Sequence, residues 1–245
     1  AGAVRNQVDM ERLLTLAAFA PKPKVSQELE PLPRPVDVRI GYPRDRAFAF
    51  YYPGDLTALE AAGAELVPFD ALTDSTLPEV DGLFIGGGFP EMVMEELSAN
   101  LSMRLAVRAF IEGDGPVYAE CGGLMYLARS IVFRGRRCEM VGVIPGEVSM
   151  HAQPRGRGYV RLRETPHHPW PDEPSPLPVE INGHEFHYSS LDALEGESRY
   201  AYEVVRGTGI DGGHDGYIYR NLLACYSHQR NTRSNAWAKR FVEHV

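Results

Sequence analysis

Four short apolar runs between residues 36 and 130 alternate with segments of helical periodicity, and this alternation constrains the fold more than any other feature of the sequence. Each run has the length of a buried strand and ends at glycine or other turn residues. The runs lie at 36–40, 64–69, 82–85 and 116–119, and the helical patterns lie at 53–63, 90–99, 102–112 and 122–130. Strands that alternate with helices are joined by crossover connections. We therefore expect an α/β fold with an open, mostly parallel sheet flanked by helices, similar to the flavodoxin-like architecture.

The second half of the chain has a different pattern, in which short β-like runs follow one another with turn residues between them. These runs lie at 140–148, 158–163, 178–188, 200–206 and 216–226. They predict strands added to the sheet in the second half of the chain. Six prolines in the segment 166–178 predict an exposed loop, and Ser234 as N-cap predicts a final helix over 235–244.

The first 35 residues differ from the rest of the chain. Residues 4–19 have a loosely helical pattern, and five prolines follow between residues 20 and 35, where neither a helix nor a central strand can form. We expect 1–35 to hold the trailing helix of an upstream domain and a proline-rich linker, and 36–245 to form the main domain.

The charge and the cysteine content exclude several classes of protein. The formal net charge is −8, from 25 basic and 33 acidic residues, which argues against general binding to nucleic acid or to acidic membranes. Only three residues are lysines, and the Gly-Lys pair that a P-loop requires is absent. No apolar run approaches the roughly 20 residues of a transmembrane helix. Three scattered cysteines suit the reducing cytoplasm and predict neither disulfides nor a metal site.

The segment 117–125 has the order of a nucleophile elbow. An apolar strand ends, Cys121 follows, and Gly122 and Gly123 open a helix. A cysteine at the start of a helix has a stabilised thiolate, and the Gly122 amide can donate to an oxyanion. The competing interpretation is a buried cysteine of the core, which is the most frequent environment of an isolated cysteine.

A second group of candidates surrounds this segment. Gly87 and Gly88 follow the strand 82–85 and would lie at the same sheet edge as Cys121, where their amides could serve as oxyanion donors. A cysteine nucleophile needs a base, usually histidine. His187 and His228 are equal candidates on sequence grounds. An arginine-rich strand is the last candidate: Arg155, Arg157, Arg161 and Arg163 predict either a solvated strand face or a clamp for carboxylates.

Three segments together resemble one known family. The runs Ala119–Leu127, Gly86–Glu91 and Gly183–Ser189 are similar to motifs of the glutamine amidotransferase domain of cobyrinic acid a,c-diamide synthases. The resemblance covers about 36–245. It implies a class I glutamine amidotransferase-like fold and hydrolysis of glutamine through a thioester on Cys121, with Gly87, Gly88 and Gly122 around the oxyanion. It also implies that ammonia amidates the a and c carboxylates of cobyrinic or hydrogenobyrinic acid in cobalamin synthesis.

The resemblance assigns the base to His228, because the segment 224–230 matches the family's histidine motif. Two positions depart from that motif, Cys225 and Arg230. Arg230 stands where other class I amidotransferases have a glutamate, so the site works as a Cys–His dyad or another carboxylate orients His228. Glu185 is the candidate for that carboxylate. Glu185 and His187 are also candidates for shaping the surface that faces the substrate.

The family resemblance also implies partners. An N-terminal ATP-binding synthetase domain would hold ATP and Mg²⁺, this chain would hold no cofactor, and the corrinoid would bind at the interface between the two domains. A homodimer is compatible with the sequence, which leaves the oligomeric state open. The alternatives are a sibling amidotransferase such as nickel-sirohydrochlorin a,c-diamide synthase or cobyric acid synthase, a stand-alone cysteine hydrolase, and a glutaminase fold that has lost its activity.

Overall fold

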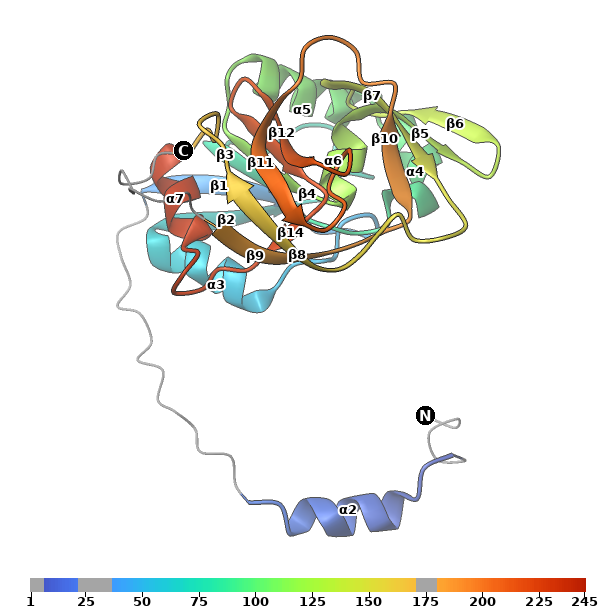
Figure 1. Cartoon of the computed structure of the whole chain (residues 1–245), viewed down its shortest axis with the longest axis vertical. Helices are drawn as coiled ribbons and strands as arrows, with labels where there is room; N and C mark the ends of the chain where they lie inside the picture. Colours follow the sequence, from blue (N-terminus) through green and yellow to red (C-terminus); the bar gives the residue numbers. More distant parts are fainter. Residues whose placement is uncertain (1–6, 22–36, 171–179) are drawn as a thin grey trace. The chain divides into compact units, whose positions relative to one another are not determined.

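The computed structural model describes residues 7–21, 37–170 and 180–245 (Figure 1). The chain divides into two units, Ala1–Leu32 and Pro33–Val245. In the first unit, α2 (Met10–Ala18) is an amphipathic helix in which the side chain of the N-cap Asp9 accepts a hydrogen bond from the Arg12 amide, and no residue of the helix is buried. The predicted helix is confirmed for this stretch. Most of the predicted linker at 20–35 lies outside the described residues.

One half of the main sheet is parallel. Its strands are β1 (Val38–Pro43), β2 (Ala64–Phe69), β3 (Gly82–Ile85), β4 (Val117–Glu120) and β13 (Leu222–Cys225). They lie in the order β13-β4-β3-β1-β2, and every neighbouring pair is parallel. The four strands expected between residues 36 and 119 are therefore confirmed. Every residue of β3 and β4 is buried, as expected for parallel strands covered on both faces.

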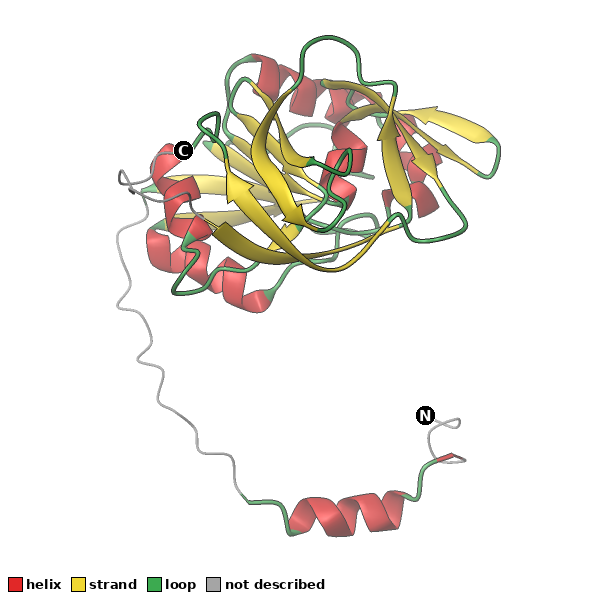
Figure 2. Cartoon of the chain, viewed as in Figure 1, coloured by secondary structure: helices red, strands yellow, loops and turns green. Residues whose placement is uncertain are grey.

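The alternation of side chains along β3 and β4 divides the core into two layers. Leu83 and Val117 face one layer, while Phe84 and Tyr118 face the other. The first layer is covered by the helices α4 (Met94–Ala99), α5 (Leu101–Glu112) and α6 (Gly122–Leu127), and the second by α3 (Pro53–Ala62) and α7 (Trp237–His244) (Figure 2). None of the helices in the described ranges is long and apolar enough to cross a membrane.

The other half of the main sheet is antiparallel and comes from the second half of the chain, as predicted. Its strands are β12 (His214–Tyr219), β11 (Arg199–Arg206), β8 (Gly156–Glu164), β9 (Glu180–His187) and β14 (His228–Gln229), in that order away from β13. Only two residues separate β13 from β14, although four strands lie between them in the sheet. The antiparallel half must therefore curl back, and the Gln229 amide donates to the Glu120 side chain at 2.8 Å.

A smaller sheet of four strands contains β10 (Ser189–Asp192), β7 (Ile144–Met150), β5 (Ala128–Phe133) and β6 (Arg136–Glu139), in that order. It corrects one prediction, because the helix expected over 122–130 ends at Leu127 and the chain continues directly into β5. The apolar residues of β5 extend the helical periodicity of α6, so periodicity alone places the boundary too late.

Two local predictions were wrong. Ser234 does not cap the last helix, which begins after Ala236 without a side-chain cap. The described part of the proline-rich segment is not an exposed loop throughout, because Trp170 is 2% exposed and packs against Trp237 and Phe241. A buried aromatic anchor therefore fixes the start of that segment, and 171–178 lies outside the described residues.

Candidate active site

Cys121 lies at the turn between β4 and α6 in a backbone conformation that L-residues rarely adopt. Its φ is 49° and its ψ is −101°. Backbone strain of this kind is typical of a nucleophile held on a tight strand-to-helix turn. The Cys121 amide donates to the Cys225 carbonyl oxygen at 2.7 Å, which ties the turn to β13. The residue is 7% exposed. The strand–cysteine–helix turn expected from the sequence is therefore present.

Two glycines after Cys121 let the end of β3 approach the start of α6. A Cβ on Gly123 would lie 2.2 Å from the Ile85 carbonyl oxygen, and one on Gly122 would lie 2.9 Å from the Gly88 nitrogen. The Gly122 amide belongs to the first turn of α6, where no intrahelical acceptor exists. The Gly88 amide donates to no other group of the described residues. Two available amides beside a thiol can stabilise an oxyanion.

His228 lies at the start of β14 and faces a carboxylate that sequence analysis did not single out. Its Nδ1 is 3.5 Å from an Oε2 of Glu120, and both side chains are almost completely buried. Burial lowers the pKa of His228, but the neighbouring Cys121 and Glu120 side chains outweigh it and raise the pKa to about 10. Glu120 is itself held by the Tyr118 hydroxyl, which donates at 2.6 Å, and by the Gln229 amide. Cys121, His228 and Glu120 therefore form one buried cluster.

The sequence carried one signal for Glu120. It ends an otherwise apolar strand of four buried residues, 117–120, where a carboxylate needs a partner. The partner comes from 108 positions further along the chain, and only the curl of the sheet brings it there.

The role expected for Glu185, orienting His228, is not the one the structure gives it. Glu185 accepts hydrogen bonds from the amides of Thr208 and Gly209 at 2.8 and 2.9 Å, and its carboxylate lies 3.8 Å from Nε2 of His187. Burial raises the pKa of Glu185, and the His187 ring and the two amides together bring it below its usual range. Glu185 thus fixes β9 to the loop between β11 and β12. Glu120, adjacent to Cys121 in sequence, occupies the position against His228.

The ring of His228 is enclosed by its neighbours. A Cβ on Gly87 would lie 2.5 Å from Cε1 of His228, so only glycine fits there. The His184 ring stacks on the other side with centroids 4.9 Å apart, and its Nε2 is 3.0 Å from the Tyr52 hydroxyl. Burial and the neighbouring His228 lower the pKa of His184. Arg230, which stands where other class I amidotransferases have a glutamate, places its guanidinium carbon 3.9 Å from the centre of the Tyr52 ring.

Cys121 opens into a cavity of about 230 Å³, which is large enough for a small amino acid. The cavity has a mixed lining, with apolar side chains on several walls and a few polar groups among them. The lining residues are Gly88, Phe89, Glu91, Cys121, Met125, Phe133, Met150, His151, Phe186, His187, Tyr188 and Ser189. Cys121, Gly88 and His187, all candidates from the sequence, therefore line one cavity. Among the described residues, no cluster of side chains is suited to a metal ion.

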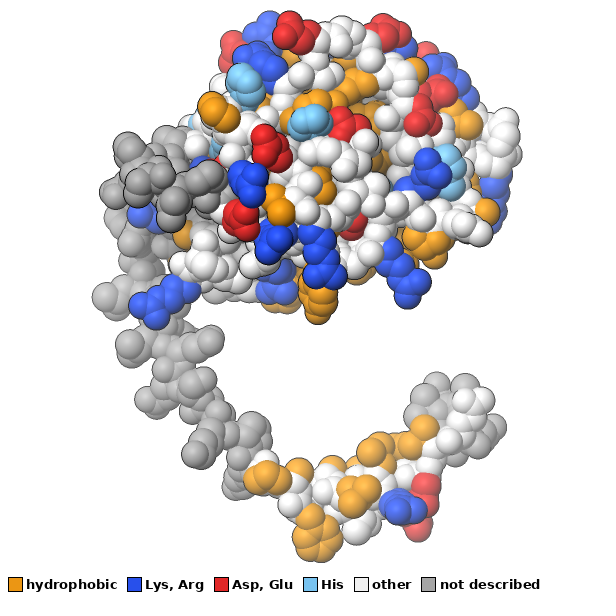
Figure 3. All heavy atoms as spheres, viewed as in Figure 1, with side chains coloured by type: hydrophobic (Ala, Val, Ile, Leu, Met, Phe, Trp, Pro, Cys, Tyr) orange, Lys and Arg blue, Asp and Glu red, His pale blue; other side chains and the backbone are white. Residues whose placement is uncertain are grey.

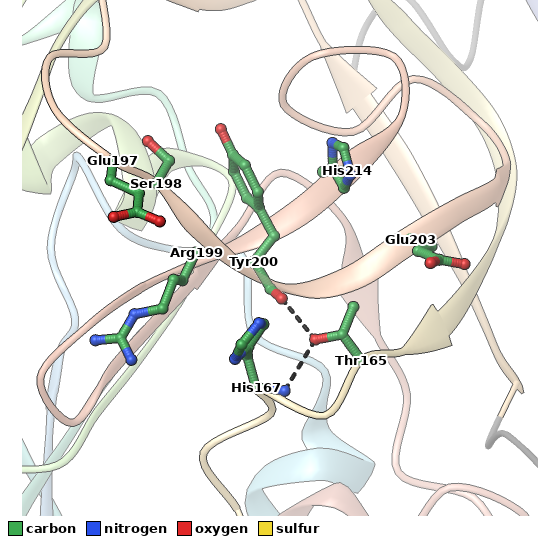
Figure 4. A pocket seen from close by; sticks show the side chains of 8 residues that line it. All are labelled: Thr165, His167, Glu197, Ser198, Arg199, Tyr200, Glu203 and His214. Carbon is green, nitrogen blue, oxygen red and sulfur yellow. Dashed lines mark hydrogen bonds between the residues drawn. The ribbon is translucent and has the colours of Figure 1, made fainter.

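A second hollow, of about 280 Å³, lies over β11 and β12 (Figure 4). Its polar groups bind one another: the Thr165 hydroxyl donates to the Tyr200 carbonyl oxygen at 2.7 Å and accepts from the His167 amide. The hollow contains no residue of the Cys121 cluster, so we assign no chemistry to it.

The arginines of β8 differ in their surroundings. Arg161 and Arg163 pair with Glu180 at 3.6 and 3.0 Å, which is the expected behaviour of a solvated strand face. Figure 3 shows basic and acidic side chains interspersed over the visible face of the main unit. Arg157, by contrast, lines a shallow depression together with Tyr159 beside the His184 side chain.

Comparison with known families gives a match over most of the chain. A sequence profile of the CobB/CobQ-like glutamine amidotransferase domain matches residues 39–236. A cobyrinate a,c-diamide synthase of Magnetococcus marinus is 44% identical over 241 residues, which are 96% of this chain and 51% of that protein. One of Archaeoglobus fulgidus is 39% identical over 98% of this chain and 51% of that protein. The chain thus spans about half the length of the curated relatives it matches.

Solved structures show the same fold at low identity. PurLQS from Thermotoga maritima matches with a TM-score of 0.59 at 13% identity, over 84% of this chain and 94% of that one. A structure described as a glutamine amidotransferase matches with a TM-score of 0.55 at 16% identity, over 84% and 97% of the two chains. These matches confirm the expected fold class, a class I amidotransferase-like sheet flanked by helices with extra strands in the second half.

Proposed function

This chain belongs to the CobB/CobQ-like glutamine amidotransferase family, and we propose that its Cys121 cluster hydrolyses glutamine and supplies ammonia to a synthetase half. The proposal rests on the arrangement of the buried cluster of Cys121, His228 and Glu120. A cysteine on a strained elbow lies beside a histidine whose pKa that cysteine and a glutamate raise, and the Gly88 and Gly122 backbones approach each other at the same elbow.

The proposed first step forms a thioester. The Cys121 thiolate adds to the side-chain amide carbon of glutamine, and the amides of Gly88 and Gly122 bind the oxygen that becomes negative. The imidazolium of His228 donates its proton to the amide nitrogen, the carbon–nitrogen bond breaks, and ammonia leaves. Glu120 stabilises the positive charge on His228, so that the charged imidazolium stands beside the Cys121 thiolate and holds the proton that the leaving nitrogen needs.

The proposed second step returns the enzyme to its starting state. Neutral His228 takes a proton from water, and the resulting hydroxide attacks the thioester carbon. The carbon–sulfur bond breaks, which releases glutamate and leaves Cys121 in its thiolate form. The charged pair of thiolate and imidazolium is thereby restored.

We further propose that the ammonia amidates the a and c carboxylates of cobyrinate or hydrogenobyrinate. The support is the name that the relatives carry, cobyrinate a,c-diamide synthase, together with the half of their length that lies outside this chain. The absence of a Gly-Lys pair from the sequence means that no residues here fit a P-loop, so ATP and Mg²⁺ belong to the synthetase half in this proposal. Free cysteines suit a cytoplasmic reaction.

Two substitutions test the glutaminase proposal. Cys121→Ser and His228→Ala are each expected to lower ammonia release from glutamine in the assembled enzyme by about 1000-fold or more, since each removes a group that acts only together with the other. Cys138→Ser is the matched control, because this partly exposed cysteine lies on β6 outside the cluster. Undiminished ammonia release in either variant would exclude the proposed mechanism.

A further inference from the structure

One carboxylate in the Cys121 cavity has no role in the chemistry proposed above. Glu91 lies on the short 3-10 turn η1 (Pro90–Met92) that follows the Gly86–Gly88 segment. The turn packs against the start of α6, because a Cβ on Gly122 would lie 3.1 Å from Cδ of Pro90. The Glu91 side chain lines the same cavity as Cys121. Its position next to the elbow is therefore fixed by the backbone.

Glu91 differs from the two glutamates that follow it. Glu95 pairs with Arg136 and Glu96 pairs with Arg46, so the charge of each is balanced at the surface. Glu91 has no lysine, arginine or histidine within ion-pair distance among the described residues. Burial raises its pKa, with only its own backbone amide opposing the rise. The carboxylate has thus lost part of its hydration without gaining a cation.

We propose that Glu91 binds the α-ammonium group of glutamine and thereby makes the cavity selective for an α-amino acid amide. This inference rests on the proposed glutaminase function and names the residue that recognises the far end of the substrate. In a cavity of this size, a glutamine whose amide carbon reaches Cys121 has its α-carbon within the same space. The ammonium is the end that Glu91 attracts, whereas the α-carboxylate would be repelled by it.

The walls of the cavity add to this selectivity. Met125, Phe133, Met150 and Phe186 offer the methylene groups of glutamine an apolar surface but no charge. A charged group in such surroundings interacts more strongly than in water, since the dielectric constant is lower. An amide substrate without the ammonium leaves Glu91 unpaired in the cavity and is disfavoured for that reason.

The test compares two substrates in two variants of the assembled enzyme. Glutamine is one substrate, and 4-carbamoylbutanoate, which is glutamine without its α-amino group, is the other. The wild type is expected to prefer glutamine in kcat/KM. Glu91→Gln keeps the shape and removes the charge, and we expect it to reduce this preference by about 10- to 100-fold, mostly through KM for glutamine. Glu91→Asp is expected to restore part of the preference.

Glu95→Gln is the matched control, because it removes a carboxylate from the next turn of the same segment outside the cavity. It should leave the preference unchanged. Alkylation of Cys121 by iodoacetamide, which has no ammonium, should proceed at the wild-type rate in Glu91→Gln and so shows that the elbow is intact. An unchanged preference in Glu91→Gln, or an equal loss with both substrates, overturns the inference and leaves the glutaminase proposal standing. Absence of glutamine hydrolysis in the wild type contradicts both.

Discussion

Glu120→Gln changes the charge that faces His228 and almost nothing else. Glutamine keeps an oxygen for the Tyr118 hydroxyl and the Gln229 amide, which donate to the Glu120 carboxylate at 2.6 and 2.8 Å. The nearly identical shape preserves the packing of β4 at the centre of the sheet. The substitution therefore isolates the electrostatic contribution of one carboxylate to the Cys121 cluster.

The size of the effect follows from the geometry. Opposite charges separated by the 3.5 Å between His228 Nδ1 and Glu120 attract by about 5 kcal/mol at an effective dielectric constant of about 20. This energy corresponds to a pKa change of about 3. Cys121 and Glu120 both raise the pKa of His228, to about 10 in the wild type, and loss of the Glu120 charge should lower it from there by about 3.

The sign of the pH dependence is fixed by the direction of this shift. Because the folded protein raises the pKa of His228, the imidazolium is present throughout the neutral range and is lost as the pH rises through about 10. The proton for the leaving ammonia is lost with it. The wild-type pH profile of kcat, measured at saturating glutamine, should thus decline near pH 10, and Glu120→Gln should move this decline down by about 2 to 3 pH units.

Glu185→Gln provides the control, since it also removes the charge of a buried glutamate beside a histidine, but that histidine is His187. The alkaline decline of Glu185→Gln should coincide with that of the wild type. NMR titration of the labelled imidazole of His228 measures the same pKa directly. If Glu120→Gln leaves both the decline and the titration of His228 unchanged, the assignment of Glu120 as the residue that charges and orients His228 is refuted.

Two further substitutions test the supports of His228. Gly87→Ala would place a Cβ 2.5 Å from the His228 ring and should lower glutaminase activity about 100-fold. Gly54→Ala is the control, because its Cβ would meet only ordinary contact distances and activity should be retained. Equal activities of the two variants would contradict the close packing around the His228 ring. The Asp215 carboxylate accepts hydrogen bonds from the backbone amides of residues 216, 226 and 227, and Asp215→Asn turns one of its oxygens into a donor. The free energy of unfolding, measured in urea, should fall by about 1 to 3 kcal/mol. An unchanged unfolding midpoint would show that the loop before His228 does not depend on Asp215.

The elbow could be predicted from the sequence because its determinants are local. The apolar strand, the cysteine and the two glycines are contiguous, and their order alone specifies a tight turn with backbone amides beside the sulfur. The same holds for Gly87 and Gly88, which follow a neighbouring parallel strand and so reach the same sheet edge.

Glu120 could not be assigned for a topological reason. Its contact with His228 depends on the curl of five antiparallel strands, and no local pattern specifies how far a sheet curls. The surroundings of Glu185 are equally non-local. Its contacts with the amides of residues 208 and 209 join β9 to a loop more than 20 positions further along the chain.

The predicted boundary between α6 and β5 was wrong for a different reason. Ala128 and Ile131 continue the apolar spacing of Leu124 and Leu127, so the local pattern favours a longer helix, and pairing with β7 overrides it. The prolines around Trp170 predict an exposed loop, whereas the Trp170 ring packs against three aromatic side chains of the core. In both places tertiary packing decides what the local sequence leaves open.

The most direct measurement of the central claim is intact-mass spectrometry of the protein quenched in acid during turnover of glutamine. The account predicts a fraction of the protein carrying one added glutamyl group, which peptide mapping places on Cys121 and which is absent from Cys121→Ser. Ammonia release that persists in Cys121→Ser, or a glutamyl group mapped to another residue, would contradict it.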